Sequence, residues 1–226
     1  MLQDARGYAI CTTQRSGSNY LCEVLSFTGV LGKPLDYFNA IGRRAKGWDD
    51  YPEDTERQLE TIVSHGSTPN AVYGCKAFAL HLDMLSGLHW STRLPGLEWV
   101  FLHRDGLLDQ AISLVVAKQT YQWRSSMAPS RAATYDAPAI QSEMTGLADD
   151  NARWQRYFTE NGLRPLVLAY DALVAEPEVA VRAVASLMAI EGPANFDPSL
   201  LTVGIQRTDR NLEWRQRFLR ESELHV

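Results

Sequence analysis

A run of apolar residues near the start of the chain passes directly into a polar turn and then into a helical pattern. The apolar run covers residues 8–13, and Leu21, Val24 and Leu25 share one face of the helix that follows. The turn brings a glycine, two hydroxyls and an arginine to the start of a helix, where unsatisfied N–H groups and the helix dipole attract anions. We therefore expect a site for a phosphate or sulfate ester. The turn consists of Gln14, Arg15, Ser16, Gly17, Ser18 and Asn19.

This turn differs from the P-loop of nucleoside triphosphatases. That loop needs a Gly-Lys-Ser/Thr sequence, whose lysine reaches the β- and γ-phosphates and whose hydroxyl holds magnesium. Here the one Gly-Lys pair is Gly32-Lys33, and Pro34 follows it. Arg15 supplies a planar, permanently charged guanidinium in place of that lysine. A plain glycine turn with Arg15 in solvent is the alternative interpretation.

Composition narrows the class of protein. The 226 residues are 45% apolar, which fits one domain spanning residues 1–226. A net charge of −5 disfavours general binding to nucleic acid. The three cysteines show no metal-ligand spacing, so we expect no metal site. Because no secretory leader pattern and no apolar run of membrane-spanning length is evident, we expect a cytoplasmic protein without a transmembrane segment.

Strand and helix patterns alternate along the chain. This alternation predicts an α/β fold with a parallel sheet, and such sheets bind ligands at the carboxyl ends of their strands. Thr13, Lys76 and Arg104 all lie at or near expected strand ends, so three strands can contribute to one crevice. Residues 43–52 are polar and expected to be exposed. Strands are expected at residues 8–13, 71–78, 97–103 and 166–170, and helices at residues 54–64, 81–90, 107–116, 143–161 and 178–190.

A second candidate anion site follows the strand expected at residues 97–103. Arg104 ends this strand and Ser113 lies two turns into the next helix, so both side chains can approach one anion. Each residue alone has a simpler explanation, because an arginine after a strand is usually solvated and a helical serine usually bonds its own backbone. Together with the first turn, they predict a ligand with two separated anionic groups.

Four segments, which follow one another along almost the whole chain, resemble a known enzyme family. Residues 14–18 look like the 5′-phosphosulfate loop of sulfotransferases, and residues 103–113 look like their 3′-phosphate motif. Four segments together resemble the bacterial carbohydrate sulfotransferases typified by the mycobacterial trehalose sulfotransferase. They are residues 14–21, residues 32–38, residues 103–113 with Gln119 and Trp123 beyond, and residues 206–214. The resemblance implies a three-layer α/β/α fold related to nucleotide kinases, with a central parallel sheet. It also implies the donor 3′-phosphoadenosine 5′-phosphosulfate, a carbohydrate or glycolipid acceptor, and a homodimer.

The resemblance assigns donor binding to both motifs. Arg15, Ser16 and the backbone N–H groups of Gly17 and Ser18 would stabilise the charge that develops on the leaving 5′-phosphate. In many sulfotransferases a late basic loop also holds the 3′-phosphate. The expected donor-binding residues are Gln14, Arg15, Ser16, Gly17, Ser18, Asn19, Arg104, Ser113, Arg207 and Arg210.

The basic C-terminal segment carries the last two of these residues. Arg207 is the first choice for folding back over the nucleotide and Arg210 is the second. The competing interpretation is a solvated helical face with ion pairs between residues four apart.

Acceptor and catalytic candidates come from the loop at residues 32–38 and from two strand ends. The resemblance places Asp36 where the family carries a glutamate that acts as general base, and the shorter side chain leaves a local turn bond as an alternative. Lys76 could face the leaving group or lie on the surface, and His103 is a secondary candidate base. The expected catalytic residues are Asp36, Arg15 and Lys76, and the expected acceptor-binding residues are Asp36, Tyr37, Phe38 and Trp123.

Two other functions compete with the sulfotransferase. A small-molecule kinase would share the strand-turn-helix site, although the missing Gly-Lys-Ser/Thr sequence counts against it. A module that binds adenosine 3′,5′-bisphosphate without turnover would be consistent with an aspartate as a weakened base. The acceptor itself is set by loops and does not follow from the fold.

Overall fold

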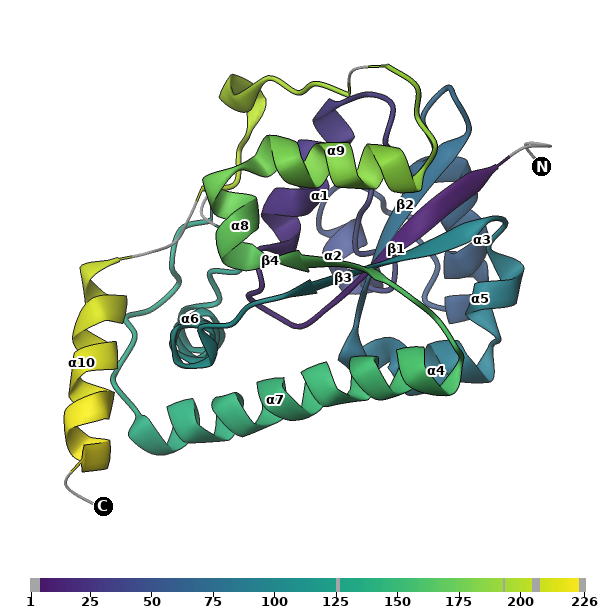
Figure 1. Cartoon of the computed structure of the whole chain (residues 1–226). Coiled ribbons are helices and arrows are strands. Elements are labelled where there is room, and N and C mark those ends of the chain that lie inside the picture. The colour runs from purple at the N-terminus through teal and green to yellow at the C-terminus, as the bar shows by residue number, and fades with distance from the viewer. Residues whose placement is uncertain (1–4, 125–126, 193, 205–207, 224–226) are drawn as a thin grey trace.

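A four-stranded parallel sheet forms the centre of the structure (Figure 1). The computed structural model describes residues 5–124, 127–192, 194–204 and 208–223. The strands lie in the order β2-β1-β3-β4, so β1 is central. They are β1 (Arg6–Thr12), β2 (Val72–Phe78), β3 (Leu97–His103) and β4 (Leu166–Ala169).

Helices fill the connections between the strands and the region after the last strand. None of the described helices is both long and apolar enough to cross a membrane. The α-helices are α1 (Ser18–Phe27), α2 (Ala40–Arg44), α3 (Thr55–Gly66), α4 (Leu82–Gly87), α5 (Trp90–Arg93), α6 (Leu107–Thr120), α7 (Ala137–Glu160), α8 (Tyr170–Ala175), α9 (Pro177–Leu187) and α10 (Asp209–Glu223). Two short 3-10 helices are η1 (Ala79–His81) and η2 (Pro198–Leu200).

Alternate side chains of β1 enter two different cores, as the two-residue period of a strand requires. Tyr8 and Ile10 pack with α1 and α9, whereas Ala9 and Cys11 belong to the core that contains the buried side chains of α3 and α7. Figure 1 correspondingly shows α1 and α9 on one face of the sheet and α7 on the other. The three-layer α/β/α fold with a central parallel sheet is therefore confirmed.

The expected elements agree well with the structure, and the differences have local causes. All four strands form within two residues of their expected bounds. The long helix α7 begins earlier than expected because Asp136 caps it by accepting a hydrogen bond from the Ala139 N–H at 2.9 Å. The helix expected at residues 81–90 is divided between α4 and α5, where His89 adopts a left-handed conformation with φ 48°.

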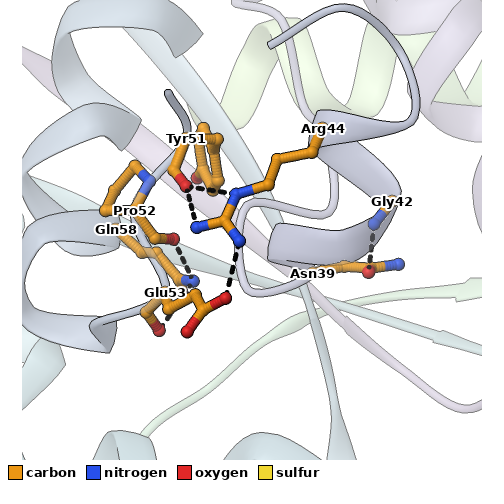
Figure 2. Close-up of polar contacts among 7 residues, drawn as sticks. All are labelled: Asn39, Gly42, Arg44, Tyr51, Pro52, Glu53 and Gln58. Atoms are coloured by element: carbon orange, nitrogen blue, oxygen red, sulfur yellow. Dashed lines mark hydrogen bonds and ion pairs between the residues drawn. The ribbon is translucent and has the colours of Figure 1, made fainter. Parts of the chain in front are cut away.

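The expectation that residues 43–52 are exposed is wrong for two of its members. Arg43 and Tyr51 are both buried. The Tyr51 hydroxyl donates to Tyr37 O at 2.7 Å, and Arg44 donates to Tyr51 O through Nε at 2.9 Å and Nη2 at 2.7 Å (Figure 2). These long-range hydrogen bonds fold the segment back onto α2, so a polar sequence is drawn against the core.

Candidate active site

A cavity of about 980 Å³ opens at the carboxyl ends of the strands. Arg15, Lys76 and Arg104 line it, and they come from the ends of β1, β2 and β3. Further walls come from α2, α8, α10 and the segment after α6. Within the described ranges, no three His, Cys, Asp or Glu side chains gather as metal ligands. The cavity occupies the place where open α/β sheets bind their ligands.

Hydrogen bonds from buried side chains fix the turn that follows β1. Trp154 Nε1 donates to Thr12 O at 2.9 Å, and the Thr12 and Ser16 hydroxyl oxygens are hydrogen-bonded at 2.6 Å. Gln110 Nε2 donates to Gln14 O at 2.6 Å from the neighbouring helix α6. The backbone of the turn is thus fixed before any ligand arrives, which favours a preorganised site.

The start of α1 faces the cavity. Gly17, Ser18 and Asn19 line the cavity, and no side chain of a described residue caps this helix at Gly17. Gly17 has φ 84°, and a Cβ atom there would lie 2.5 Å from the ring of Tyr170. Only glycine satisfies both the conformation and the close approach. The ten-residue helix α1 therefore presents N–H groups and its positive dipole end to a ligand.

Arg15, Arg104 and Ser113 come together beside this helix start. Arg15 adopts a left-handed backbone with φ 61°, and its Nε donates to Ser113 Oγ at 2.9 Å. Arg104 Nη1 reaches Arg15 O at 3.4 Å, and its guanidinium lies 4.5 Å from the ring centroid of Tyr170. Burial lowers the pKa of Arg15, and the neighbouring charge of Arg104 lowers it further. Two partly buried like charges at the edge of a cavity are the arrangement that an anionic ligand stabilises.

Asp36 and Lys76 lie in the cavity because the loop before Asp36 is attached to the edge of the sheet. The Lys76 N–H donates to Leu35 O at 2.9 Å, so this loop follows β2. Lys76 is 3% exposed, and its Nζ donates to Asn19 Oδ1 at 2.8 Å. Asp36 Oδ1 is buried and has no hydrogen-bond partner among the described residues. Asp36 therefore lines the cavity with a carboxylate, one oxygen of which is buried and unpartnered.

Several expected site residues are placed elsewhere. Tyr37 is fully buried in the core, and its hydroxyl donates to Lys33 O at 3.0 Å. Ser16 is buried, with its hydroxyl directed to Thr12, so only its backbone can reach a ligand. Arg210 is exposed in the first turn of α10 and is not among the described residues that line the cavity. Arg207 lies outside the described residues.

Three other expected residues differ in whether they line the cavity. Phe38 and Trp123 line the cavity, and the Trp123 carbonyl accepts a hydrogen bond from Arg15 Nη1 at 3.0 Å. His103 does not line it among the described residues. Its Nδ1 lies 3.0 Å from Asp105 Oδ1 and its ring stacks on Phe101. His103 is therefore held by Asp105 and Phe101 beside the neighbouring Arg104.

Sequence reasoning missed two groups of residues that shape the cavity. Tyr170 forms the wall against Gly17 and the platform under Arg104, but no local motif marks a tyrosine at the start of α8. Arg43, Lys46 and Arg124 also line the cavity. Only the basic character of the segments that contain these three residues could have identified them as cavity residues. Many solvated segments share that character.

Comparisons with known proteins agree with this geometry. The chain is 29% identical to the trehalose 2-sulfotransferase of Mycobacterium tuberculosis (strain ATCC 35801 / TMC 107 / Erdman), with 98% of this chain and 97% of that protein covered. It is 28% identical to the trehalose 2-sulfotransferase of Mycolicibacterium smegmatis (strain ATCC 700084 / mc(2)155), with 96% and 95% covered.

A solved structure has the same fold. A sulfotransferase domain from the curacin biosynthetic pathway superposes with a TM-score of 0.54 at 12% identity, covering 95% of this chain and 97% of that domain. The model of the Stf0 sulphotransferase family matches residues 7–221. Because this match covers most of the chain, the protein belongs to the Stf0 sulphotransferase family and is a sulfotransferase rather than a kinase.

Proposed function

We propose that this enzyme transfers a sulfuryl group from 3′-phosphoadenosine 5′-phosphosulfate to a hydroxyl group of a carbohydrate or glycolipid. The observation that carries the proposal is one cavity lined both by the start of α1 with Arg15 and Arg104 and by the carboxylate of Asp36. The two relatives named for trehalose support a carbohydrate acceptor. A homodimer and a cytoplasmic location stay predictions.

The donor fits the half of the cavity that β1 and β3 build. The donor supplies an activated sulfuryl group on its 5′-phosphate. The start of α1 and Arg15 would bind the phosphosulfate, while Arg104 and Ser113 would bind the 3′-phosphate. The open helix start at Gly17 fits a phosphate in place of a side-chain cap.

The reaction needs one proton acceptor and a stabilised leaving group. As the bond between the acceptor oxygen and sulfur forms, the bond between sulfur and the bridging oxygen of the 5′-phosphate breaks. Asp36, which lines the cavity, would accept the proton of the acceptor hydroxyl on its carboxylate. Arg15, Lys76 and the N–H groups of α1 would stabilise the negative charge that the leaving phosphate gains.

A transfer assay tests this proposal. Purified enzyme is incubated with donor labelled with ³⁵S at the sulfuryl group and with a panel of neutral and anionic carbohydrates. We expect label to move onto at least one carbohydrate without added metal. Transfer that needs ATP and magnesium in place of this donor would contradict the proposal.

A further inference from the structure

The cavity is strongly basic in a chain whose net charge is −5. Seven arginine or lysine residues and two aspartates line it among the described residues. Arg215 is satisfied by Asp109, since its Nε lies 3.2 Å from Asp109 Oδ1. Arg15, Arg104 and Lys76 belong to the proposed donor site. Three further cations therefore share the remaining carboxylate, which is that of Asp36.

These three cations form an acceptor-side cluster, defined here as Arg43, Lys46 and Arg124. Arg43 is in α2, Lys46 follows that helix, and Arg124 lies in the segment after α6. None of the three has an ion-pair partner within 4 Å among the described residues. Asp36 is close enough to raise the pKa of Arg43 but does not pair with it at that distance. The cluster thus has more positive charge than the described protein neutralises.

Arg43 is the best-defined member of the cluster. It is 4% exposed, and its buried Nε has no hydrogen-bond partner among the described residues. Its guanidinium lies 5.6 Å from the ring centroid of Trp48. A buried guanidinium donor without a partner costs stability unless a ligand satisfies it.

The backbone around Arg43 is held in place. The Asn39 side chain caps α2 by accepting a hydrogen bond from the Gly42 N–H at 2.8 Å. Arg44 anchors the other end through Tyr51 O and Glu53 (Figure 2). Because neighbouring helical residues point in different directions, this anchoring of Arg44 fixes Arg43 toward the cavity. Within the cluster, Arg43 is therefore held by α2 itself, and its guanidinium cannot easily turn to solvent.

The charges of the cluster act on one another and on Lys76. Burial lowers the pKa of Lys46 to about 8, and the charges of Arg124, Arg43 and Lys76 lower it further. The charge that depresses the pKa of Arg15, in contrast, is that of Arg104. Lys76 is thus linked to the donor side through Asn19 and to the cluster through its charge, whereas Arg15 and Arg104 act on one another.

We propose that Arg43, Lys46 and Arg124 bind a negatively charged group of the acceptor, so that the acceptor is a carbohydrate bearing a carboxylate, phosphate or sulfate. This inference rests on the proposed function and names the substrate class of the same cavity. The anionic group would occupy the acceptor-side cluster while Asp36 receives the proton of a neighbouring hydroxyl. The neutral sugar in the names of the relatives would then be a poorer acceptor here.

Calorimetry on enzyme saturated with adenosine 3′,5′-bisphosphate tests the proposal with glucose, glucose 6-phosphate and glucuronate as probes. We expect at least one of the anionic sugars to bind about tenfold or more tightly than glucose, since each arginine contact is charge-assisted. Inorganic phosphate and acetate at equal ionic strength serve as references. Equal affinities for all three sugars, absence of binding by any, or ion binding as tight as sugar binding would overturn the proposal.

Variants assign the effect to the cluster. Arg43→Gln, Lys46→Gln and Arg124→Gln should each lower the affinity for the anionic sugar about tenfold, and Arg43→Lys should restore part of it. Arg57→Gln is the matched control, because Arg57 is exposed on α3 and does not line the cavity among the described residues. Lys46 and Arg124 are more exposed than Arg43, so their variants stay informative if Arg43→Gln fails to fold.

Donor binding separates failure of this inference from failure of the proposed function. The three cluster variants should bind adenosine 3′,5′-bisphosphate as the unmodified enzyme does, whereas Arg15→Ala should not. If Arg43→Gln weakens bisphosphate binding as much as Arg15→Ala does, the cluster belongs to the donor site and this inference fails. If the unmodified enzyme does not bind the bisphosphate, the proposed function itself fails.

Discussion

The two sides of the cavity differ in how their charged groups are held. On the side of β1 and β3, Arg15 Nε donates to Ser113 Oγ, and Lys76 of β2 reaches this side by donating to Asn19 Oδ1. Gln110 Nε2 holds the turn, while Gln110 Oε1 is itself buried without a partner among the described residues. On the side of α2, Arg43 Nε and Asp36 Oδ1 are buried without hydrogen-bond partners among the described residues. We therefore expect the donor to bind on the first side, where the cations are already bonded to the protein, and the acceptor to bind on the second.

The largest effect is expected from Asp36→Asn. The change keeps the shape of the side chain but removes its basicity, so sulfuryl transfer should slow about a hundredfold or more while bisphosphate affinity stays the same. Single-turnover transfer rates and calorimetry measure the two quantities. Asp49→Asn is the control, since Asp49 is exposed and does not line the cavity among the described residues. Normal turnover by Asp36→Asn would show that Asp36 is not the proton acceptor.

Arg15→Ala and Arg104→Ala should weaken bisphosphate binding next most strongly. Each variant removes charge-assisted hydrogen bonds, which corresponds to about 1.5–3 kcal/mol, or roughly ten- to a hundredfold in affinity. Calorimetric titration of both variants beside Arg57→Gln checks this expectation. Unchanged affinity in both variants would show that the side of the cavity formed by β1 and β3 does not bind the donor.

Gly17→Ala separates backbone strain from the close approach of Tyr170. Alanine at φ 84° costs about 1–2 kcal/mol, and its Cβ atom would also overlap the ring of Tyr170. Gly29→Ala is a matched control, because Gly29 has φ 69° but nothing within 4 Å of an added Cβ atom.

Thermal unfolding and bisphosphate titration distinguish the two glycine variants. Both should have a lower unfolding temperature, and Gly17→Ala should have the larger decrease. Only Gly17→Ala should weaken bisphosphate binding, since Gly29 follows the end of α1. If the two variants behave alike, the contact with Tyr170 does not shape the donor site.

The smallest effect concerns the titration of Lys46. Its pKa is about 8 because burial and the charges of Arg124 and Arg43 disfavour the ammonium form, so Lys46 should lose its proton as pH rises through 8. Removing a neighbouring positive charge in Arg124→Gln should raise this pKa. The chain has four lysines, so NMR of ¹³C-methylated lysines resolves the titration, with Lys46→Arg as the assignment control. No shift in Arg124→Gln would show that the cluster is not electrostatically coupled.

Local sequence patterns predicted the sheet and the side of the cavity formed by β1 and β3. The apolar runs mark β1 and β3, and Gly17 marks the turn because the conformation there needs glycine. Both signals are contained in a few adjacent residues. The parallel order of the strands then brings Lys76 and Arg104 to the same edge.

The half formed by α2 could not be predicted in the same way. Tyr37 was expected to bind the acceptor, but it packs in the core while its neighbours Asp36 and Phe38 line the cavity. Nothing in this short loop distinguishes the three side chains, since the Tyr37 ring lies against Trp48 and its carbonyl oxygen accepts a hydrogen bond from Tyr51, and both partners come from a later segment. Arg43 is buried although it begins a polar segment, and its guanidinium lies over the ring of Trp48.

The most direct measurement of the central claim is calorimetric titration of the enzyme with adenosine 3′,5′-bisphosphate in the presence of a metal chelator. ADP and ATP with magnesium are titrated in parallel. The account predicts tight binding of the bisphosphate without metal, with at least tenfold weaker binding of ADP because the 3′-phosphate is missing. Equal binding of ADP and the bisphosphate, or a preference for ATP with magnesium, would contradict it.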